Sequence, residues 1–116
     1  MNIQIFGKNK CFDTKKAERY FKERSIIYQY VDLGKYGMSR KELESVRAAV
    51  GLDAMIDERD QDYPLIAYLA SNDAKLEKLF EDPWLIKSPV VRNGKQATVG
   101  YQPEVWKAWE AAEKNR

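Results

Sequence analysis

The sequence predicts a mixed α/β domain in which a β-α-β unit is followed by a block of helices, a β-hairpin and a closing helix. An alternating apolar segment at residues 2–6 leads directly into an amphipathic helical pattern, which indicates the β-α-β unit. The dipeptide Asn93-Gly94 is the strongest two-residue hairpin signal in the chain. With 116 residues, of which 44% are hydrophobic, the chain is long and apolar enough for one core.

The first third of the chain predicts two parallel strands joined by a helix. Residues 2–6 alternate isoleucines with polar residues and end at a glycine, which is typical of a strand entering a loop. From Asp13 the pattern becomes helical, and Tyr20 and Phe21 lie on its apolar face. Residues 26–32 are rich in β-branched and aromatic side chains and predict the second strand. The crossover between the two strands is expected to be right-handed.

The middle of the chain predicts several helices. Ser39 and Glu42 form the capping-box pattern, and the helix that they begin runs to Gly51. Residues 52–80 predict two or three short helices, and Pro83 closes this helical stretch.

The last third predicts two strands at residues 88–91 and 96–99, on either side of the Asn-Gly turn. Pro103 suits the first position of a final helix. Apart from a helical insertion at about residues 39–82, this order of elements is that of the thioredoxin core. The chain is therefore expected to form a single thioredoxin-like domain over residues 1–116.

The composition excludes several classes of protein. With 20 basic and 18 acidic residues the net charge is only +2, so direct nucleic-acid binding is not expected. The N-terminal residues do not fit a signal peptide and no apolar run is long enough to span a membrane, so we expect a cytoplasmic protein without a membrane partner. The absence of histidine excludes Ser-His-Asp and Cys-His catalysis and imidazole zinc sites, and no metal site is expected.

Cys11 is the only cysteine and the candidate nucleophile. It lies after the first strand and just ahead of the first helix, where free amide groups and the helix dipole favour a thiolate. Lys8, Lys10 and Lys15 add positive charge near it. Asp13, which is expected to cap the helix, acts in the opposite direction. The balance predicts a lowered thiol pKa. The alternative is an inert buried cysteine, which the polar loop around it disfavours.

Two further residues are candidates for this site. Arg59 could pair with a thiolate or an anionic substrate, although its three acidic neighbours make an ordinary surface ion pair the alternative. Pro89 precedes a strand, and proline is tolerated only at the start or edge of a strand. In thioredoxin-like folds a cis proline at this place faces the active cysteine and leaves the preceding backbone free for an extended thiol ligand. The alternative is an ordinary trans proline.

Together these segments resemble the arsenate reductase-like family, which includes the ArsC reductases, the Spx regulators and the small YffB-type proteins. The segments that carry the resemblance are FGKNKCFDTKKA (residues 6–17), DER (57–59), LIKSPVV (85–91) and VGY (99–101). The first is similar to the YffB-type pattern KNCDT-KKA with Phe12 inserted, and the last is similar to Spx. The resemblance implies that Cys11 is the nucleophile and that Arg59 is the arginine of the helical block.

The chain departs from this family at several positions. Arsenate reductases of this type place an arginine where this chain has Ser88, and another where it has Tyr101-Gln102. Lys87, one residue away, compensates only in part, so tight oxyanion binding is not expected. Thr14 stands where many Spx proteins carry a second cysteine, which excludes an internal disulfide switch.

These observations favour a single-cysteine thiol–disulfide oxidoreductase that holds no bound cofactor. Cys11 would attack a disulfide, and an external thiol, glutathione as co-substrate or a glutaredoxin, would resolve the mixed disulfide. The residues expected to bind substrate or an anion are Lys8, Asn9, Lys10, Arg59, Lys87 and Pro89. One alternative is a non-enzymatic Spx-like module, which the resemblance would link to RNA polymerase. Another is a degenerate arsenate reductase.

Overall fold

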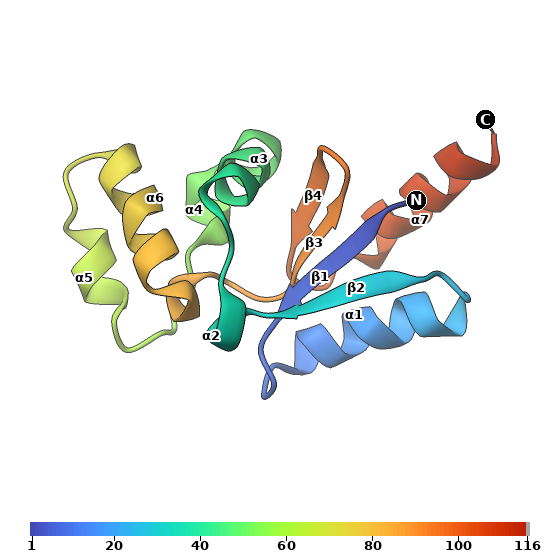
Figure 1. The fold of residues 1–116 in the computed structure, drawn as a ribbon, viewed down its shortest axis with the longest axis horizontal. Helices are drawn as coiled ribbons and strands as arrows, with labels where there is room; N and C mark the ends of the chain where they lie inside the picture. The colour runs from blue at the N-terminus through green and yellow to red at the C-terminus, as the bar shows by residue number, and fades with distance from the viewer. Residues whose placement is uncertain (116) are drawn as a thin grey trace.

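A four-stranded sheet of order β2-β1-β3-β4 forms the centre of the protein in the computed structural model, which describes residues 1–115 (Figure 1). Strand β1 (Ile3–Gly7) pairs in parallel with β2 (Tyr28–Asp32) and antiparallel with β3 (Val90–Asn93). Strand β4 (Gln96–Val99) returns antiparallel to β3. The predicted β-α-β unit and the predicted hairpin therefore meet in one sheet, in which β1 is central.

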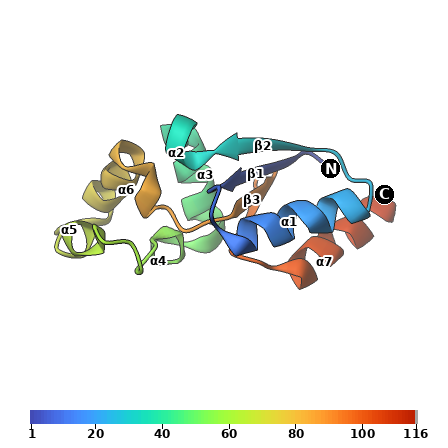
Figure 2. The ribbon, with the colours of Figure 1, turned by 90° about the horizontal axis from the view of Figure 1, so that it is seen from below.

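Seven α-helices and one 3-10 turn surround this sheet in the described chain. They are α1 (Phe12–Glu23), α2 (Leu33–Tyr36), α3 (Arg40–Val50), α4 (Leu52–Met55), α5 (Tyr63–Ala67), α6 (Asn72–Glu81), η1 (Pro83–Leu85) and α7 (Pro103–Lys114). Helices α1 and α7 lie on one side of the sheet, and the elements from α3 to η1, here called the helical block, lie beyond its other side (Figure 2). Within residues 1–115 no helix is both long and apolar enough to cross a membrane.

The alternation of side chains along β1 divides the core into two clusters. Ile3 and Ile5 face α1 and α7, where they pack with Phe21 and Trp106. Phe6 points to the opposite face and joins the apolar side chains of the helical block. Because side chains alternate along a strand, the five residues of β1 contribute side chains to both clusters. The carboxyl end of β1 therefore lies between helices α1 and α7 on one side and the helical block on the other.

Helix α1 begins one residue earlier than the sequence predicts. Its first residue is Phe12, and its N-cap is Cys11, whose carbonyl accepts a hydrogen bond from the backbone N–H of Lys15 at 3.3 Å. The expectation that Asp13 caps this helix is wrong, because Asp13 already lies in the first helical turn. Its carboxylate still favours the helix there through the helix dipole. Cys11 itself therefore lies at the N-terminus of α1.

The capping box predicted for α3 is present. The Ser39 hydroxyl accepts from the backbone N–H of Glu42 at 3.1 Å, and the Glu42 carboxylate accepts from the backbone N–H of Ser39 at 2.9 Å. The short helix α2 follows β2 directly, and its N-cap is Asp32, whose side chain accepts from the backbone N–H of Gly34. Local side-chain capping thus sets both helix starts.

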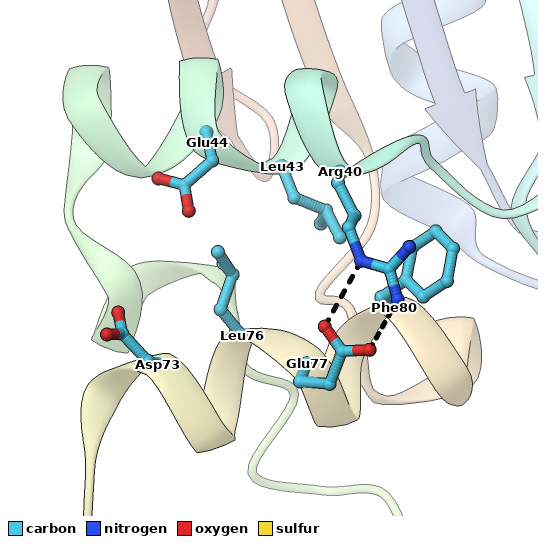
Figure 3. A pocket seen from close by; sticks show the side chains of 7 residues that line it. All are labelled: Arg40, Leu43, Glu44, Asp73, Leu76, Glu77 and Phe80. Atoms are coloured by element: carbon cyan, nitrogen blue, oxygen red, sulfur yellow. Dashed lines mark hydrogen bonds and ion pairs between the residues drawn. The ribbon is translucent and has the colours of Figure 1, made fainter.

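Helices α3 and α6 form a pocket of their own within the helical block. Figure 3 shows Arg40 of α3 reaching across to α6, where its guanidinium donates to both carboxylate oxygens of Glu77 at 3.2 and 2.6 Å. The same guanidinium lies 4.0 Å from the centre of the Phe80 ring. None of the predicted site residues lines this pocket. This pocket is therefore not the candidate site.

Candidate functional site

Cys11 lies in the turn between β1 and α1, at the carboxyl end of the central strand. Its backbone N–H donates to the carbonyl of Lys8 at 3.1 Å, which closes the turn that leads out of β1. The side chain is half-buried and forms no cap hydrogen bond to the helix. The sulfur is thus held at a helix N-terminus with part of its surface open to solvent.

The nearest backbone group on the other side of the thiol belongs to the residue before β3. Cys11 Sγ donates to the carbonyl of Ser88 at 3.6 Å. The Ser88–Pro89 peptide bond is cis, the isomer that a thioredoxin-like fold implies. Pro89 is buried, and its carbonyl accepts from the backbone N–H of Gly100 at 2.8 Å. The start of β3 is therefore fixed by the end of β4 as it approaches Cys11.

The pKa of Cys11 lies below the usual value of a cysteine thiol. Burial of the sulfur by itself raises this pKa, because it removes water from the thiolate. The lowering comes from the Ser88 and Thr14 side chains and from the backbone N–H groups of Thr14 and Asp13, which stabilise the thiolate by hydrogen bonding. The Ser88 side chain and the donors at the start of α1 together outweigh desolvation, which favours the nucleophilic thiolate.

Thr14 also connects this site to the loop before it. Its hydroxyl oxygen accepts from the backbone N–H of Lys8 at 3.4 Å, and the side chain is buried. Since a hydroxyl carries one proton and two lone pairs, accepting from Lys8 leaves its proton available for the sulfur of Cys11. Thr14 therefore joins the two ends of the β1–α1 turn.

Lys8 does not present a free ammonium group to an anion. The side chain is buried, and its Nζ donates to the backbone carbonyl of Trp84 at 2.8 Å and to the Asp57 carboxylate at 3.4 Å. The ammonium also lies 5.7 Å from the centre of the Trp84 ring. Asp57 lies between α4 and α5 and Trp84 lies in η1, so both partners belong to the helical block. Lys8 thus joins the sheet to that block.

Cys11 opens into a groove of about 710 Å³, here called the Cys11 groove. Its lining residues are Lys8, Lys10, Cys11, Phe12, Asp13, Asp57, Arg59, Asp60, Gln61, Trp84 and Ser88. The groove therefore brings together four predicted site residues: Lys8, Lys10, Cys11 and Arg59. Within residues 1–115, the side chains of Lys10 and Arg59 form no ion pair or hydrogen bond, so they are the two uncompensated cations of the groove.

Three predicted site residues do not line the Cys11 groove. Asn9 is exposed on the turn, and Pro89 is buried behind Ser88. Lys87 is exposed, and its backbone N–H donates to the Met55 carbonyl at 2.7 Å, next to the short antiparallel bridge between Ile56 and Ile86. That backbone pairing sets the direction of its side chain, which lies outside the groove.

Sequence reasoning missed several residues of the groove. Phe12 and Trp84 line it with side chains that are 77% and 50% exposed. Thr14 entered the sequence analysis only as the place of a missing cysteine, and Ser88 only as the place of a missing arginine. The spacing of Thr14, three residues after the N-cap, could have revealed its role, because that position can reach back to the cap. No local sequence pattern indicates that Trp84 lines the groove.

The fold and the site together define a thioredoxin-like α/β protein with one cysteine at the N-terminus of its first helix. A family model described as the ArsC family matches residues 6–109. The chain belongs to the ArsC family, so the predicted family and the predicted fold class are both confirmed.

Individual relatives agree with this assignment. The global transcriptional regulator Spx 2 of Oceanobacillus iheyensis is 30% identical over 110 residues, which cover 90% of this chain and 80% of that protein. The structure of the arsenate reductase from Vibrio cholerae matches with a TM-score of 0.79 and 25% identity, over 90% of this chain and 94% of the other. The YffB protein matches in fold with a TM-score of 0.81 and 22% identity, over 92% and 97% of the two chains.

Proposed function

We propose that this ArsC-family protein is a single-cysteine thiol–disulfide oxidoreductase, with Cys11 as its nucleophile. The observation that carries the proposal is the thiol at the N-cap of α1, whose pKa is lowered and whose sulfur opens into the Cys11 groove. A thiolate reacts with disulfides whereas a thiol does not. We treat residues 1–116 as one thioredoxin-like domain that acts without a bound cofactor, in a reducing compartment such as the cytoplasm.

The reaction has two exchange steps. In the first, the Cys11 thiolate attacks a mixed disulfide between a substrate thiol and glutathione, forms an S–S bond to the glutathione sulfur and releases the substrate thiolate. In the second, a glutathione thiolate attacks that glutathione sulfur, which yields glutathione disulfide and regenerates the Cys11 thiolate. The substrate sulfur is reduced and one free glutathione is oxidised, while the glutathione of the mixed disulfide stays at the disulfide level, so no other electron donor is needed. A glutaredoxin thiol could replace glutathione in the second step.

Charge supports glutathione as the co-substrate. The tripeptide carries two carboxylates and one ammonium group, and the groove presents the unpaired side chains of Lys10 and Arg59 beside the carboxylates of Asp13 and Asp60. A guanidinium binds a carboxylate with two parallel hydrogen bonds, while an ammonium acts as a point charge. The backbone of Ser88, next to the cis proline, offers polar groups for the peptide portion. Lys8 already donates to Asp57 and Trp84, so it takes no part in this binding.

Intact-mass measurement after mixing the reduced protein with glutathione disulfide tests the proposal. One glutathione adduct is expected on the native chain and none on the Cys11→Ser variant. The pH dependence of alkylation by iodoacetamide gives the thiol pKa, which is expected below that of the same chain unfolded in urea. A native protein that forms no adduct and has an ordinary thiol pKa would contradict the proposal.

A second candidate function follows from the relative named as a global transcriptional regulator, Spx 2. In this case the chain would be a protein-binding module, with RNA polymerase as the partner that the Spx resemblance implies. A pull-down with purified RNA polymerase separates the two functions, since binding that survives Cys11→Ser favours the regulator. Loss of thiol exchange in the same variant, without any binding, favours the oxidoreductase.

Arsenate reduction is less well supported, although the arsenate reductase from Vibrio cholerae shares the fold. Ser88 puts a neutral hydroxyl where reductases of this type are expected to place a guanidinium. The remaining free cations of the groove are Lys10 and Arg59. An arsenate assay coupled to glutathione and glutaredoxin is expected to show no turnover.

A further inference from the structure

Strand β2 is an open edge of the sheet. It pairs only with β1, and Figure 2 shows it as the outermost strand on its side of the sheet, with no element alongside it. In the described chain, the backbone of residues 28–31 forms no hydrogen bond other than those to β1. The opposite edge strand, β4, contacts helix α3.

Natural edge strands are usually protected by charged residues, proline or a bulge. Residues 26–31 have the sequence Ile-Ile-Tyr-Gln-Tyr-Val and contain no charge and no proline. Their pairing with β1 runs without interruption from Tyr28 to Asp32. Ile27, just before the strand, is 90% exposed. Within β2 only the last residue, Asp32, is charged, so most of this edge lacks the usual protection.

The sequence of this edge is nearly the same when read in either direction. The segment Ile-Tyr-Gln-Tyr-Val at residues 27–31 is symmetric about Gln29, with one aliphatic residue at each end and one tyrosine on each side. A two-fold axis through Gln29 would pair two antiparallel copies so that Tyr28 lies opposite Tyr30 and Ile27 lies opposite Val31. A symmetric dimer needs such a self-complementary surface.

The two faces of the sheet agree with this register. Tyr28 and Tyr30 lie beside Ile3 and Ile5 on the face covered by α1 and α7, where they pack against the same cluster. Val31 packs with the other cluster, and Gln29 accepts a hydrogen bond from Gln4. Directly opposed residues of an antiparallel pair share a face. The tyrosines would therefore meet on one face.

The aliphatic residues would meet on the other face. There, the exposed Ile27 of each copy would lie against Val31 of the second copy, which already packs in the helical-block cluster. We propose that the occupant of this edge is a second copy of the chain, joined by antiparallel β2–β2 pairing about Gln29. The two four-stranded sheets would then form one continuous sheet.

Disulfide trapping tests both the contact and its register. In a Cys11→Ser background, Gln29→Cys would place two cysteines opposite each other, so a covalent dimer is expected under mild oxidation. Ile27→Cys would separate its two cysteines by four residues of strand, about 13 Å, and should not link. Gln96→Cys, an exposed glutamine on β4, is the matched control. Equal linking of all three variants, or linking of Ile27→Cys alone, would overturn the proposal.

Sedimentation velocity tests the dimer without any cysteine. A monomer–dimer equilibrium is expected for the native chain, and Gln29→Lys, which puts two like charges across the axis, should weaken it about fivefold or more. Gln96→Lys should leave the equilibrium unchanged, and circular dichroism shows whether each variant is folded. A native chain that is monomeric at every concentration its solubility allows would overturn the proposal.

Discussion

The two walls of the Cys11 groove are built in different ways. On the sheet side, Cys11 and Ser88 are placed by the start of α1 and the start of β3, with the buried Thr14 behind them. On the other side, the loop that carries Asp57 and Arg59 belongs to the helical block. The buried side chain of Lys8 joins that wall to the sheet by hydrogen bonds.

Substitutions in the two walls should therefore affect different properties, namely reactivity for the sheet wall and stability for the other wall. Residues of the sheet wall contact the sulfur but their side chains hold few other elements in place, so substitutions there should alter reactivity more than folding. Lys8 never contacts the sulfur in the hydrogen-bond network, yet it joins two layers. The Arg59 backbone N–H donates to the same Asp57 carboxylate that Lys8 binds, at 3.0 Å. Loss of Lys8 should therefore disturb the position of Arg59 as well.

The largest expected effect is the complete loss of exchange in Cys11→Ser. No other cysteine is available to replace the nucleophile. Because serine is a good N-cap residue and Cys11 forms no cap hydrogen bond, stability should stay within about 0.5 kcal/mol of the native value or rise. Intact mass after exposure to glutathione disulfide and urea unfolding measure the two effects. A large loss of stability would show that the sheet wall is not independent of folding.

Lys8→Met should give the largest loss of stability, about 2–4 kcal/mol. The substitution leaves the Asp57 carboxylate and the Trp84 carbonyl without their buried donor, which is costly even where methionine fills the space. Urea unfolding measures the change. Lys10→Met, two residues further on and exposed, is the matched control and should change stability by about 0.5 kcal/mol or less. Equal effects of the two substitutions would contradict the joining role of Lys8.

Arg59→Ala should reduce the rate of reaction with glutathione disulfide about fivefold, because one exposed charge pair contributes up to about 1 kcal/mol. Stability should not change, because the Arg59 guanidinium forms no interaction within the described residues. Stopped-flow measurement at low and high salt checks the result, and the difference should shrink at high salt. Arg19→Ala, on the exposed side of α1, is the control. A rate that is insensitive to both substitutions would remove Arg59 from the binding site.

Thr14→Val should have the smallest effect, about a threefold slower reaction at neutral pH. The lost hydroxyl is one of the donors that lower the Cys11 pKa, so this pKa should rise. Above both pKa values the thiol is fully ionised in either chain, and the two rates should converge. Thr14→Ser keeps the hydroxyl and should react like the native chain. A rate difference that persists at high pH would indicate a packing effect.

The lowered thiol pKa also links stability to pH. Because the folded chain holds its thiolate more readily than the unfolded chain, ionisation of Cys11 stabilises the fold at pH values above the unfolded pKa. This contribution is lost as the pH falls through the folded pKa. The Cys11→Ser variant should lack that part of the pH dependence, which urea unfolding over the alkaline range can measure.

The parts of the fold that the sequence predicts well are set by local interactions. The alternation along β1, the Ser39–Glu42 capping box and the Asn-Gly hairpin each involve residues a few positions apart. The start of α1 was misplaced by one residue, because an acidic residue near a helix terminus favours the cap and the first turn alike. Asp13 occupies the first turn.

The candidate site was only partly predictable because its second wall depends on distant residues. Lys8 meets Asp57 and Trp84, which follow it by 49 and 76 positions, and no periodicity reports such a contact. A buried, compensated lysine and a free lysine look alike in a sequence, so Lys8 and Lys10 could not be told apart. Lys87 lies outside the groove for a related reason, since its direction is set by backbone pairing with the helical block.

The hydroxyl of Thr14 illustrates what such an arrangement means for reactivity. In water, solvent dipoles must reorient around a newly formed thiolate, and the free energy of this reorientation is part of the activation barrier. Here one dipole already has its direction set, because the oxygen of Thr14 is occupied by the N–H of Lys8. The protein therefore acts as a solvent whose molecules are aligned before the charge arrives.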